Sequence, residues 1–425
     1  METSVFKKRR QDLSSQYSRT LFVISSGSEA MRSHSVAYRH KTAGDFLYLC
    51  GVEVIDAVLV VVGATTYLLS EAFNKEASVW DDGFALTATD KEKLAGVRFE
   101  NLEKLEEILR SHFDECDRIA LPIGRNRKID GILLSAVSYE HRHCGRVSNT
   151  PLAICDSRTL VGSLRQIKTA EEISFMKEAG ARSSLVHTEL MRQNFLGQSE
   201  RSVVNWIESR FMEQGMQWTA YESIAGSGER STILHARGTE RILQAGEVLL
   251  VDAGGEWKGY CSDITRVLPV GKTFSDEQKA IYQIVLDAQK AVLNAVKPGE
   301  SLKSLHELAL TVLSEGLLKE GFSKDYVRES LRQLMPHSTS HWIGLDVHDP
   351  SPYFDDSGNS LKLQEGMCFT VEPGIYFRKG LGAPSKYEGI GVRIEDDVVV
   401  TAKGCDLLTS VPKEISEVES LRASL

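Results

Sequence analysis

The C-terminal part of the chain repeats one order of hydrophobic and polar patterns. Stretches with apolar residues at helical spacing begin at Thr169 and near Ser199, and β-forming apolar runs follow them. The same order then recurs, with a helix that starts at Ser275, a second helix over Ser301–Leu318, and further β-forming runs. Thr169 and Ser275 each open a capping box. The pattern predicts two related halves, each made of two helices followed by strands, that face one another.

The first part of the chain alternates β-forming runs with helical stretches. Lys91–His112 carries apolar residues at helical spacing with charged residues between them, and this pattern predicts a helix. Strands that alternate with helices are typical of an α/β domain. The predicted strands are Leu21–Ile24, Ala57–Val62 and Thr66–Leu69.

The chain is long enough to form two domains. A single hydrophobic core rarely serves 425 residues, so two domains are the expected organisation. The boundary is predicted near Ser163–Lys168, just before the capping box at Thr169. We therefore predict an α/β N-terminal domain over residues 1–163 and an α+β domain, made of the two halves, over residues 164–425.

The composition is that of an ordinary globular protein. Hydrophobic residues make up 42% of the chain and charged residues 26%. The formal net charge of −9 argues against nucleic acid as a partner, because such binding needs a basic face. The one basic run, Lys7-Lys8-Arg9-Arg10, predicts the solvated face of an N-terminal helix.

The sequence predicts a cytoplasmic protein with no membrane partner. The best apolar stretch, Ala57–Val62, is too short to cross a bilayer. The N-terminus lacks an apolar signal region. The cysteines, 7 in number and scattered from Cys50 to Cys405, show no disulfide framework and no paired metal spacing. Reduced thiols are therefore expected.

Four acidic residues lie where strongly β-forming runs end or are interrupted. Asp252 and Glu372 close such runs, and Asp263 and Glu395 interrupt them. Strands of this kind are normally buried, and buried carboxylates repel one another and lose their hydration. Something positive must compensate. Together with His341, the acids make an oxygen-rich ligand set that suits a pair of divalent cations such as Mn²⁺, Co²⁺ or Zn²⁺.

At these residues the chain resembles the pita-bread metallopeptidases and, within them, the Xaa-Pro aminopeptidases (aminopeptidase P). The matching motifs span the C-terminal domain in the family's order. In the N-terminal domain, Tyr38-Arg39 and Asp45–Gly51 resemble a segment typical of aminopeptidase P. The C-terminal motifs are Val251–Gly254, Tyr260–Arg266, Ser340–Asp349, Thr370–Tyr376 and Gly391–Asp397.

The resemblance implies a pita-bread fold for the C-terminal domain and a dinuclear metal centre within it. Asp252 would bind one ion, His341 and Glu372 would bind the other, and Asp263 and Glu395 would bridge both. The implied cofactors are two divalent metal ions, with Mn²⁺ favoured and Zn²⁺ or Co²⁺ as alternatives. Such a pair of ions activates water near neutral pH.

The resemblance also implies roles for other residues. Glu372 is the expected general base as well as a ligand. His235 and His348 match histidines that hold the substrate carbonyl and the tetrahedral intermediate, and His337 matches a third histidine of the pocket. Arg393 would orient a carboxylate or meet substrate. The alternatives are packing roles for the histidines and a structural ion pair for the arginine.

Two positions depart from the family's pattern. Ser338 stands where the family usually has Gly, which removes backbone freedom. Ala236 stands where relatives commonly have Tyr. Neither is an expected metal ligand. Trp80 resembles a tryptophan that reaches a neighbouring subunit's active site in some relatives, with ordinary packing as the alternative.

The function implied by the resemblance is a metal-dependent exopeptidase that removes the N-terminal residue from peptides with proline at the second position. The nearest alternative is a prolidase, which cleaves only Xaa-Pro dipeptides. The compact segments over residues 349–364 and 378–387 favour the aminopeptidase. A non-catalytic pita-bread module that binds peptides or proteins, and a metal-free creatinase-type enzyme, are less favoured. Relatives form homodimers or homotetramers, so a homo-oligomer is expected.

Overall fold

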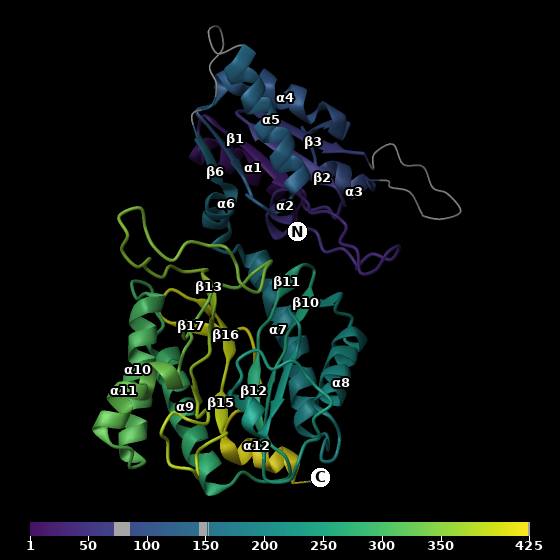
Figure 1. The fold of residues 1–425 in the computed structure, drawn as a ribbon. Helices are drawn as coiled ribbons and strands as arrows, with labels where there is room; N and C mark the ends of the chain where they lie inside the picture. Colours follow the sequence, from purple (N-terminus) through teal and green to yellow (C-terminus); the bar gives the residue numbers. More distant parts are fainter. Residues whose placement is uncertain (72–85, 144–150, 152, 424–425) are drawn as a thin grey trace. The chain divides into compact units, whose positions relative to one another are not determined.

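The structure, a computed structural model, describes residues 1–71, 86–143, 151 and 153–423 (Figure 1). The chain divides into two compact units, Met1–Arg165 and Gln166–Leu425. Trp80 lies outside the described residues. Within the described part of the chain, none of the helices combines the length and the hydrophobicity needed to cross a membrane.

The first unit is an α/β domain built on a six-stranded sheet. Its strands are β1 Thr20–Ser25, β2 Ala57–Val62, β3 Thr65–Ser70, β4 Arg98–Glu100, β5 Arg118–Leu121 and β6 Ala153–Asp156, and its helices are α1 Ser4–Gln16, α2 Gly44–Cys50, α3 Ala88–Lys93, α4 Leu105–Ser111, α5 Arg127–His143 and α6 Ser157–Arg165. The strand order is β4-β3-β2-β1-β5-β6. One core joins the sheet to α4 and α5, and α1, α2 and α6 also contact the central strands. The predicted α/β class is confirmed.

The helix predicted over Lys91–His112 is wrong in its first half. α3 ends at Lys93, Gly96 follows with a left-handed backbone (φ +80°), and Arg98–Glu100 forms β4 beside β3. Asn101 then starts a new helical segment, where its side chain accepts a hydrogen bond from a backbone N–H. A glycine in the left-handed region ends a helix, so the apolar spacing belongs only to the second segment.

The basic run Lys7-Lys8-Arg9-Arg10 is solvated only in its first half, which corrects the prediction. Lys7 and Lys8 are exposed, whereas Arg9 and Arg10 are 4% and 3% exposed. Arg9 lies over the ring of a tyrosine of α2, 3.9 Å from its centroid. Arg10 donates to the carbonyl of Leu49 (2.8 Å) near the end of α2. Carbonyls at a helix C-terminus attract a cation and satisfy its donors, which is why this charge can be buried.

The second unit contains helices followed by strands twice, as the sequence predicts, with a third helix, α11, added in the second half. The first half comprises α7 Ala170–Met191, α8 Glu200–Glu213, β7 Trp218–Thr219, β8 Ile224–Ser227, β9 Val248–Asp252, β10 Gly255–Trp257, β11 Tyr260–Cys261 and β12 Thr265–Pro269. The second half comprises α9 Asp276–Ala295, α10 Leu302–Lys319, α11 Lys324–Leu334, β13 Cys368–Val371, β14 Gly374–Tyr376, β15 Gly391–Arg393, β16 Asp396–Val400 and β17 Cys405–Leu407, and α12 Ile415–Arg422 follows. In Figure 1 the strands β12, β15 and β16 lie between α7 and α8 on one side and α9 to α11 on the other.

Both predicted capping boxes are present at the first helix of each half. Thr169 Oγ1 accepts the N–H of Glu172 (3.3 Å), and Ser275 Oγ accepts the N–H of Gln278 (3.3 Å). Each of these helices then buries an apolar stripe; Ile281 of α9, for example, is 0% exposed in a core shared with β9 and β12. The caps fix where the helices begin, and the stripes fix which face packs on the strands.

Each half of the second unit also contains the same arrangement of strands. β9 pairs antiparallel with β12, and the β10–β11 hairpin lies between them in the sequence. β13 pairs antiparallel with β16, and the β14–β15 pair lies between them. Asp252 ends β9 and Glu372 follows β13, while Asp263 shortly precedes β12 and Glu395 directly precedes β16. The acids therefore occupy equivalent places in the two halves.

Candidate metal centre

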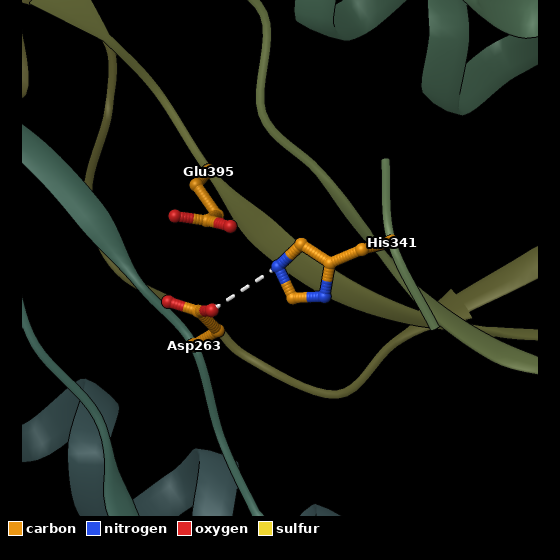
Figure 2. A group of neighbouring side chains, drawn as sticks. All are labelled: Asp263, His341 and Glu395. Atoms are coloured by element: carbon orange, nitrogen blue, oxygen red, sulfur yellow. Dashed lines mark ion pairs between the residues drawn. The ribbon is translucent and has the colours of Figure 1, made fainter. Parts of the chain in front are cut away.

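The predicted acids and His341 come together in one cavity of the second unit. The cavity has a volume of about 450 Å³. Ligand atoms of Asp263, His341 and Glu395 all lie within 4.8 Å of one another (Figure 2). Every residue that the sequence predicts for the site lines this cavity, namely Asp252, Asp263, His341, Glu372, Glu395, His235, His337, His348 and Arg393.

Pairing with β13 holds the segment that carries His341. The backbone N–H of His341 donates to Thr370 Oγ1 (3.1 Å), and its carbonyl accepts the N–H of Thr370 (3.0 Å). The ring Nδ1–H donates to the carbonyl of Trp342 (3.2 Å). Nε2 therefore faces the acids, at 3.4 Å from Asp263 Oδ2 and 3.6 Å from Glu372 Oε1. The imidazole presents one nitrogen to the cluster and anchors the other.

The cluster holds more negative charge than its own cations neutralise. Burial raises the pKa of Asp263, and Asp252 raises it further. Burial also raises the pKa of Glu372 to about 7, and it raises the pKa of Glu395 well above its usual range. Burial alone would lower the pKa of His341, but Asp263 and Glu372 raise it to about 9. A divalent cation would replace these protons, so the oxygen-rich donor set fits hard divalent metal ions.

Arg393 is a buried cation beside the acids, 3% exposed. Its guanidinium donates to the Asp252 carboxylate, to Thr265 Oγ1 (3.0 Å) and to the Tyr376 hydroxyl (2.8 Å). The Tyr376 hydroxyl lies 2.9 Å from His337 Nε2. Arg393 therefore orients a carboxylate of the first half from a strand of the second half, and it reaches His337 through Tyr376.

The three remaining predicted histidines face the cavity. His337 lies with Nδ1 3.7 Å from Glu372 Oε2, and burial, with the Arg393 charge, lowers its pKa to about 4. The ring of His348 stands edge-on to that of His341, with the centroids 4.5 Å apart. His235 is exposed on the cavity wall. At neutral pH, His337 is therefore an uncharged imidazole with a fixed orientation.

The two departures from the family's pattern lie in different places. Ser338 is exposed and lines the cavity beside His337. Ala236 is 1% exposed and packs beneath Gly226 of β8. It is not among the described residues that line the cavity, although its neighbour His235 is. Of the two positions, Ser338 is the one that a ligand in the cavity would meet.

Tyr221 belongs to the site and was not predicted from the sequence. Its hydroxyl contacts both Asp252 (2.5 Å) and Asp263. Burial and the neighbouring carboxylates raise the pKa of Tyr221 well above its usual range, so the hydroxyl remains a donor. Thr265 and Tyr376 were missed in the same way. In a single sequence, hydroxyl residues in or beside β-forming runs are ordinary core or edge residues, and no signal distinguishes these three.

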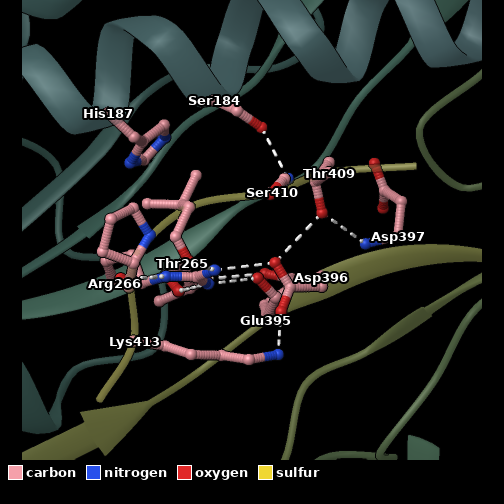
Figure 3. A network of polar contacts seen from close by, with 12 residues as sticks. Ser184, His187, Thr265, Arg266, Glu395, Asp396, Asp397, Thr409, Ser410 and Lys413 are labelled. Carbon is pink, nitrogen blue, oxygen red and sulfur yellow. Dashed lines mark hydrogen bonds and ion pairs between the residues drawn. The ribbon is translucent and has the colours of Figure 1, made fainter. Parts of the chain in front are cut away.

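A polar network behind Glu395 ties the two halves together (Figure 3). Thr265 Oγ1 donates to Glu395 Oε2 (2.6 Å). Arg266 donates to the Glu395 carbonyl (2.5 Å) and to Asp396 (2.7 Å), and Lys413 donates to Asp396 (2.7 Å). Burial alone would raise the pKa of Asp396, but Arg266 and Lys413 hold it below its usual value. Glu395, which belongs to the second half, is thus held in place by Thr265 and Arg266 of β12 in the first half.

Comparisons with known proteins show family matches in both units of the chain. Residues 174–402 match metallopeptidase family M24, and residues 6–120 match the aminopeptidase P N-terminal domain. The chain is 33% identical over 428 residues to Xaa-Pro aminopeptidase of Escherichia coli (strain K12), which covers 98% of this chain and 97% of that protein. It is 30% identical to Xaa-Pro aminopeptidase 3 of Homo sapiens, which covers 95% and 80% respectively.

The similarity extends to solved structures. The low-pH form of aminopeptidase P from Escherichia coli gives a TM-score of 0.90 at 31% identity, covering 100% of this chain and 99% of that one. Proline aminopeptidase P II from Yersinia pestis gives a TM-score of 0.90 at 32% identity, covering 100% of both chains. The predicted pita-bread fold is thereby confirmed. The chain belongs to metallopeptidase family M24 and, within it, to the Xaa-Pro aminopeptidases, a family of metallo-exopeptidases.

Proposed function

We propose that this protein removes the N-terminal residue from peptides with proline at the second position, in a metal-dependent hydrolysis. One observation carries the proposal: a single cavity brings together the acids of both halves, His341 and the buried Arg393. An acidic cavity of this kind is suited to hydrolysis assisted by metal ions. The relatives named Xaa-Pro aminopeptidase, aligned over nearly the whole chain, support the same reaction.

The proposed metal ligands are Asp252, Asp263, His341, Glu372 and Glu395. Two divalent ions, with Mn²⁺ favoured over Zn²⁺ or Co²⁺, suit this oxygen-rich set and its excess of negative charge. Bound there, the ions would polarise the substrate carbonyl and lower the pKa of a water molecule. The close approach of ligand atoms from Asp263, His341 and Glu395, all within 4.8 Å, supports this assignment.

Glu372 is proposed as the general base. Its carboxylate lies 3.6 Å from His341 Nε2 and 3.7 Å from His337 Nδ1, so it is close to both the ligand set and the cavity wall. With metal ions bound, Glu372 would be an ionised carboxylate, which can take a proton from the attacking water and release it to the departing nitrogen.

His235 and His348 are proposed to bind the substrate carbonyl and the tetrahedral intermediate, and His337 is proposed to line the pocket. The Nδ1–H of His337 donates to the Ser338 carbonyl (2.8 Å), which fixes the orientation of this ring in the pocket wall. Arg393 is proposed to position Asp252 and not to contact substrate. Each of its three guanidinium nitrogens already donates one hydrogen bond, to Thr265, Tyr376 or Asp252, which supports that choice.

Charge and bond chemistry support cleavage at the first bond before proline. The free α-amine of a peptide is attracted to the acidic cluster, which limits hydrolysis to the N-terminal residue. The bond to proline has no N–H, and metal polarisation of the carbonyl requires none. A solved structure of Escherichia coli aminopeptidase P contains the inhibitor Pro-Leu, and that structure gives a TM-score of 0.90 with this chain.

A prolidase and a non-catalytic peptide-binding module are the remaining alternatives. The complete ligand set argues against the non-catalytic module, and the names of the aligned relatives favour the aminopeptidase. A cytoplasmic location is also part of the proposal, supported by described cysteines that are all free. The proposed assembly is a homodimer or homotetramer, on the family resemblance alone.

The test is hydrolysis of Xaa-Pro-Xaa tripeptides and matched Xaa-Pro dipeptides, with added Mn²⁺ and with a chelator. Metal-dependent cleavage of the tripeptides supports the proposal. Cleavage of dipeptides alone would assign the protein as a prolidase. Absence of hydrolysis from protein shown to bind two metal ions would overturn both assignments.

A further inference from the structure

An exposed ion pair lies at the mouth of the active-site cavity. Arg237 Nε lies 3.0 Å from Glu222 Oε2, and the two side chains are 77% and 62% exposed. Both residues line the cavity that contains the acids. An ion pair this exposed contributes little stability and opens at little cost. Each of the two charges is therefore free to exchange its partner for a charged group of a bound peptide.

The backbone places this pair on adjoining extended segments that lead directly into the site. Arg237 forms an antiparallel bridge with Ile224, and Ala225 N–H donates to the carbonyl of residue 236 (3.0 Å). Side chains two residues apart on an extended segment point to the same face, so Glu222 lies diagonally across from Arg237. Glu222 directly follows Tyr221, whose hydroxyl contacts the acids, and Arg237 is two residues beyond His235. The rim charges are thus held close to the reacting groups.

The inner and outer parts of the cavity contain different sets of charged residues. The inner part contains the acids with Arg393, all buried or largely buried. Among the exposed residues described along its lining, only Glu222 and Arg237 carry a fixed charge. A peptide with its α-amine against the inner acids can continue outward only past the mouth. The residues that follow the proline therefore meet the rim, where Arg237 supplies the positive charge.

We propose that Arg237 is a specificity-determining residue that binds a carboxylate located after the proline of the substrate, and that Glu222 is the group which this carboxylate displaces. The inference rests on the proposed function and names its substrate class. The carboxylate is the C-terminus of a short peptide or an acidic side chain just after the proline. Either one brings to Arg237 the same planar, two-oxygen acceptor that Glu222 now provides.

The test compares three peptides on the metal-loaded enzyme: Ala-Pro-Ala, Ala-Pro-Ala-amide and Ala-Pro-Asp-amide. The wild-type protein should have a KM about 2- to 5-fold lower for Ala-Pro-Ala than for its amide, as an exposed charge pair predicts. Arg237→Gln should reduce this ratio to about 1, and Glu222→Gln should increase it, because the competing carboxylate is gone. Raising the salt concentration should shrink the wild-type ratio. Ala-Pro-Asp-amide distinguishes a side-chain carboxylate from the C-terminal one.

Two further variants control for charge and folding. Arg237→Lys keeps the charge and should retain part of the difference in KM between Ala-Pro-Ala and its amide. Arg201→Gln removes another exposed arginine, paired with Glu240 outside the described cavity lining, and should keep the wild-type ratio. Equal KM ratios in wild type and Arg237→Gln would overturn the inference while leaving the peptidase assignment intact. If the metal-loaded wild-type protein cleaves none of the peptides, the proposed function fails and this inference fails with it.

Discussion

Thr339 is held through both its backbone and its side chain by one ring nitrogen of His306. The Thr339 N–H donates to His306 Nδ1 (3.2 Å), and the Thr339 Oγ1 lies 2.9 Å from the same atom. Thr339 is 0% exposed, and its carbonyl accepts the N–H of Glu372 (2.8 Å). His306, on α10, therefore holds in place the segment that carries His337 and His341, through its hydrogen bonds to Thr339. Because Nδ1 accepts both bonds, the ring proton lies on Nε2.

Loss of the hydrogen bonds between Thr339 and His306 should lower kcat more than it lowers the stability of the fold. We expect Thr339→Val, which keeps the shape and removes the hydroxyl, to reduce kcat by about 10-fold, since it leaves a buried acceptor partly unsatisfied. Thr339→Ser should retain most of the activity. His306→Asn, whose side-chain oxygen can replace Nδ1 as acceptor, should exceed His306→Leu in kcat. Steady-state kinetics at saturating metal gives these values. Equal kcat values for the Asn and Leu variants would show that the hydrogen bonds do not position the site.

Removal of metal should abolish hydrolysis and lower the melting temperature together. The buried carboxylates of Asp252, Asp263 and Glu395 repel one another unless a cation or protons compensate. At a metal concentration about 100-fold above the dissociation constant, binding to the folded state alone stabilises it by about 2.7 kcal/mol. Differential scanning calorimetry with Mn²⁺ and with a chelator measures the shift. The metal-dependent shift should shrink in Asp263→Asn, and a shift of wild-type size in that variant would remove Asp263 from the ligand set.

Tyr221→Phe should destabilise the metal-free protein more than the metal-loaded one. In the metal-free protein, the Tyr221 hydroxyl is a donor placed between the carboxylates of Asp252 and Asp263. Its loss should lower the free energy of unfolding of the metal-free protein by about 1–3 kcal/mol, the range for a buried acceptor left without its partner. Bound cations would take over this compensation. Urea unfolding of both proteins in both metal states measures the difference, and an equal loss in the two states would contradict the account.

His187 should make the stability of the wild-type protein fall as the pH is lowered from about 6.5 to about 4. Its Nε2–H donates to the carbonyl of Ala253 (2.8 Å), and its Nδ1 has no hydrogen-bond partner among the described residues. Burial lowers the pKa of His187 to about 4, so the unfolded chain binds the proton first as the pH falls. Neutral His187 makes its full contribution to the free energy of unfolding above the pKa of the unfolded chain's histidine, and this contribution amounts to about 3 kcal/mol at most.

His187→Gln is the matched variant for this prediction, because glutamine keeps a donor for the Ala253 carbonyl and does not titrate. Carboxylates that titrate in the same range are common to both proteins and cancel in the comparison. Urea unfolding at pH 7.5 and pH 4.5 should show a smaller loss of stability in the variant. Parallel losses would mean that His187 is protonated in the folded protein.

The gathering of the acids in one cavity could be predicted from the sequence because these acids break a local rule. Asp252, Asp263, Glu372 and Glu395 stand in or beside β-forming runs whose other members are buried, and a buried carboxylate requires a cation. The two halves were predictable for a similar reason, since local caps and apolar stripes mark each pair of helices. These signals lie within a few residues of one another in the chain.

Features that depend on distant parts of the chain could not be predicted in this way. Arg10 belongs to a run that resembles a solvated face, and it is buried because carbonyls near the ends of α2 and α3 accept its hydrogen bonds. Tyr221 and Thr265 are ordinary residues locally, and they acquire their roles when the acids of both halves are in place. The helix predicted over Lys91–His112 is wrong in its first half because Gly96 separates α3 from the later segment, to which the apolar spacing belongs.

The division of the acids between the halves has a consequence during protein synthesis. A nascent chain that has emerged only as far as the end of α9 contains Asp252 and Asp263 but lacks His341, Glu372 and Glu395. Even after those residues emerge, Glu395 reaches its place only when its strand docks on Thr265. A partly made or half-folded chain therefore lacks the complete set of acids with which to cleave the other nascent peptides around it, and proteolytic competence requires both halves to be folded and docked.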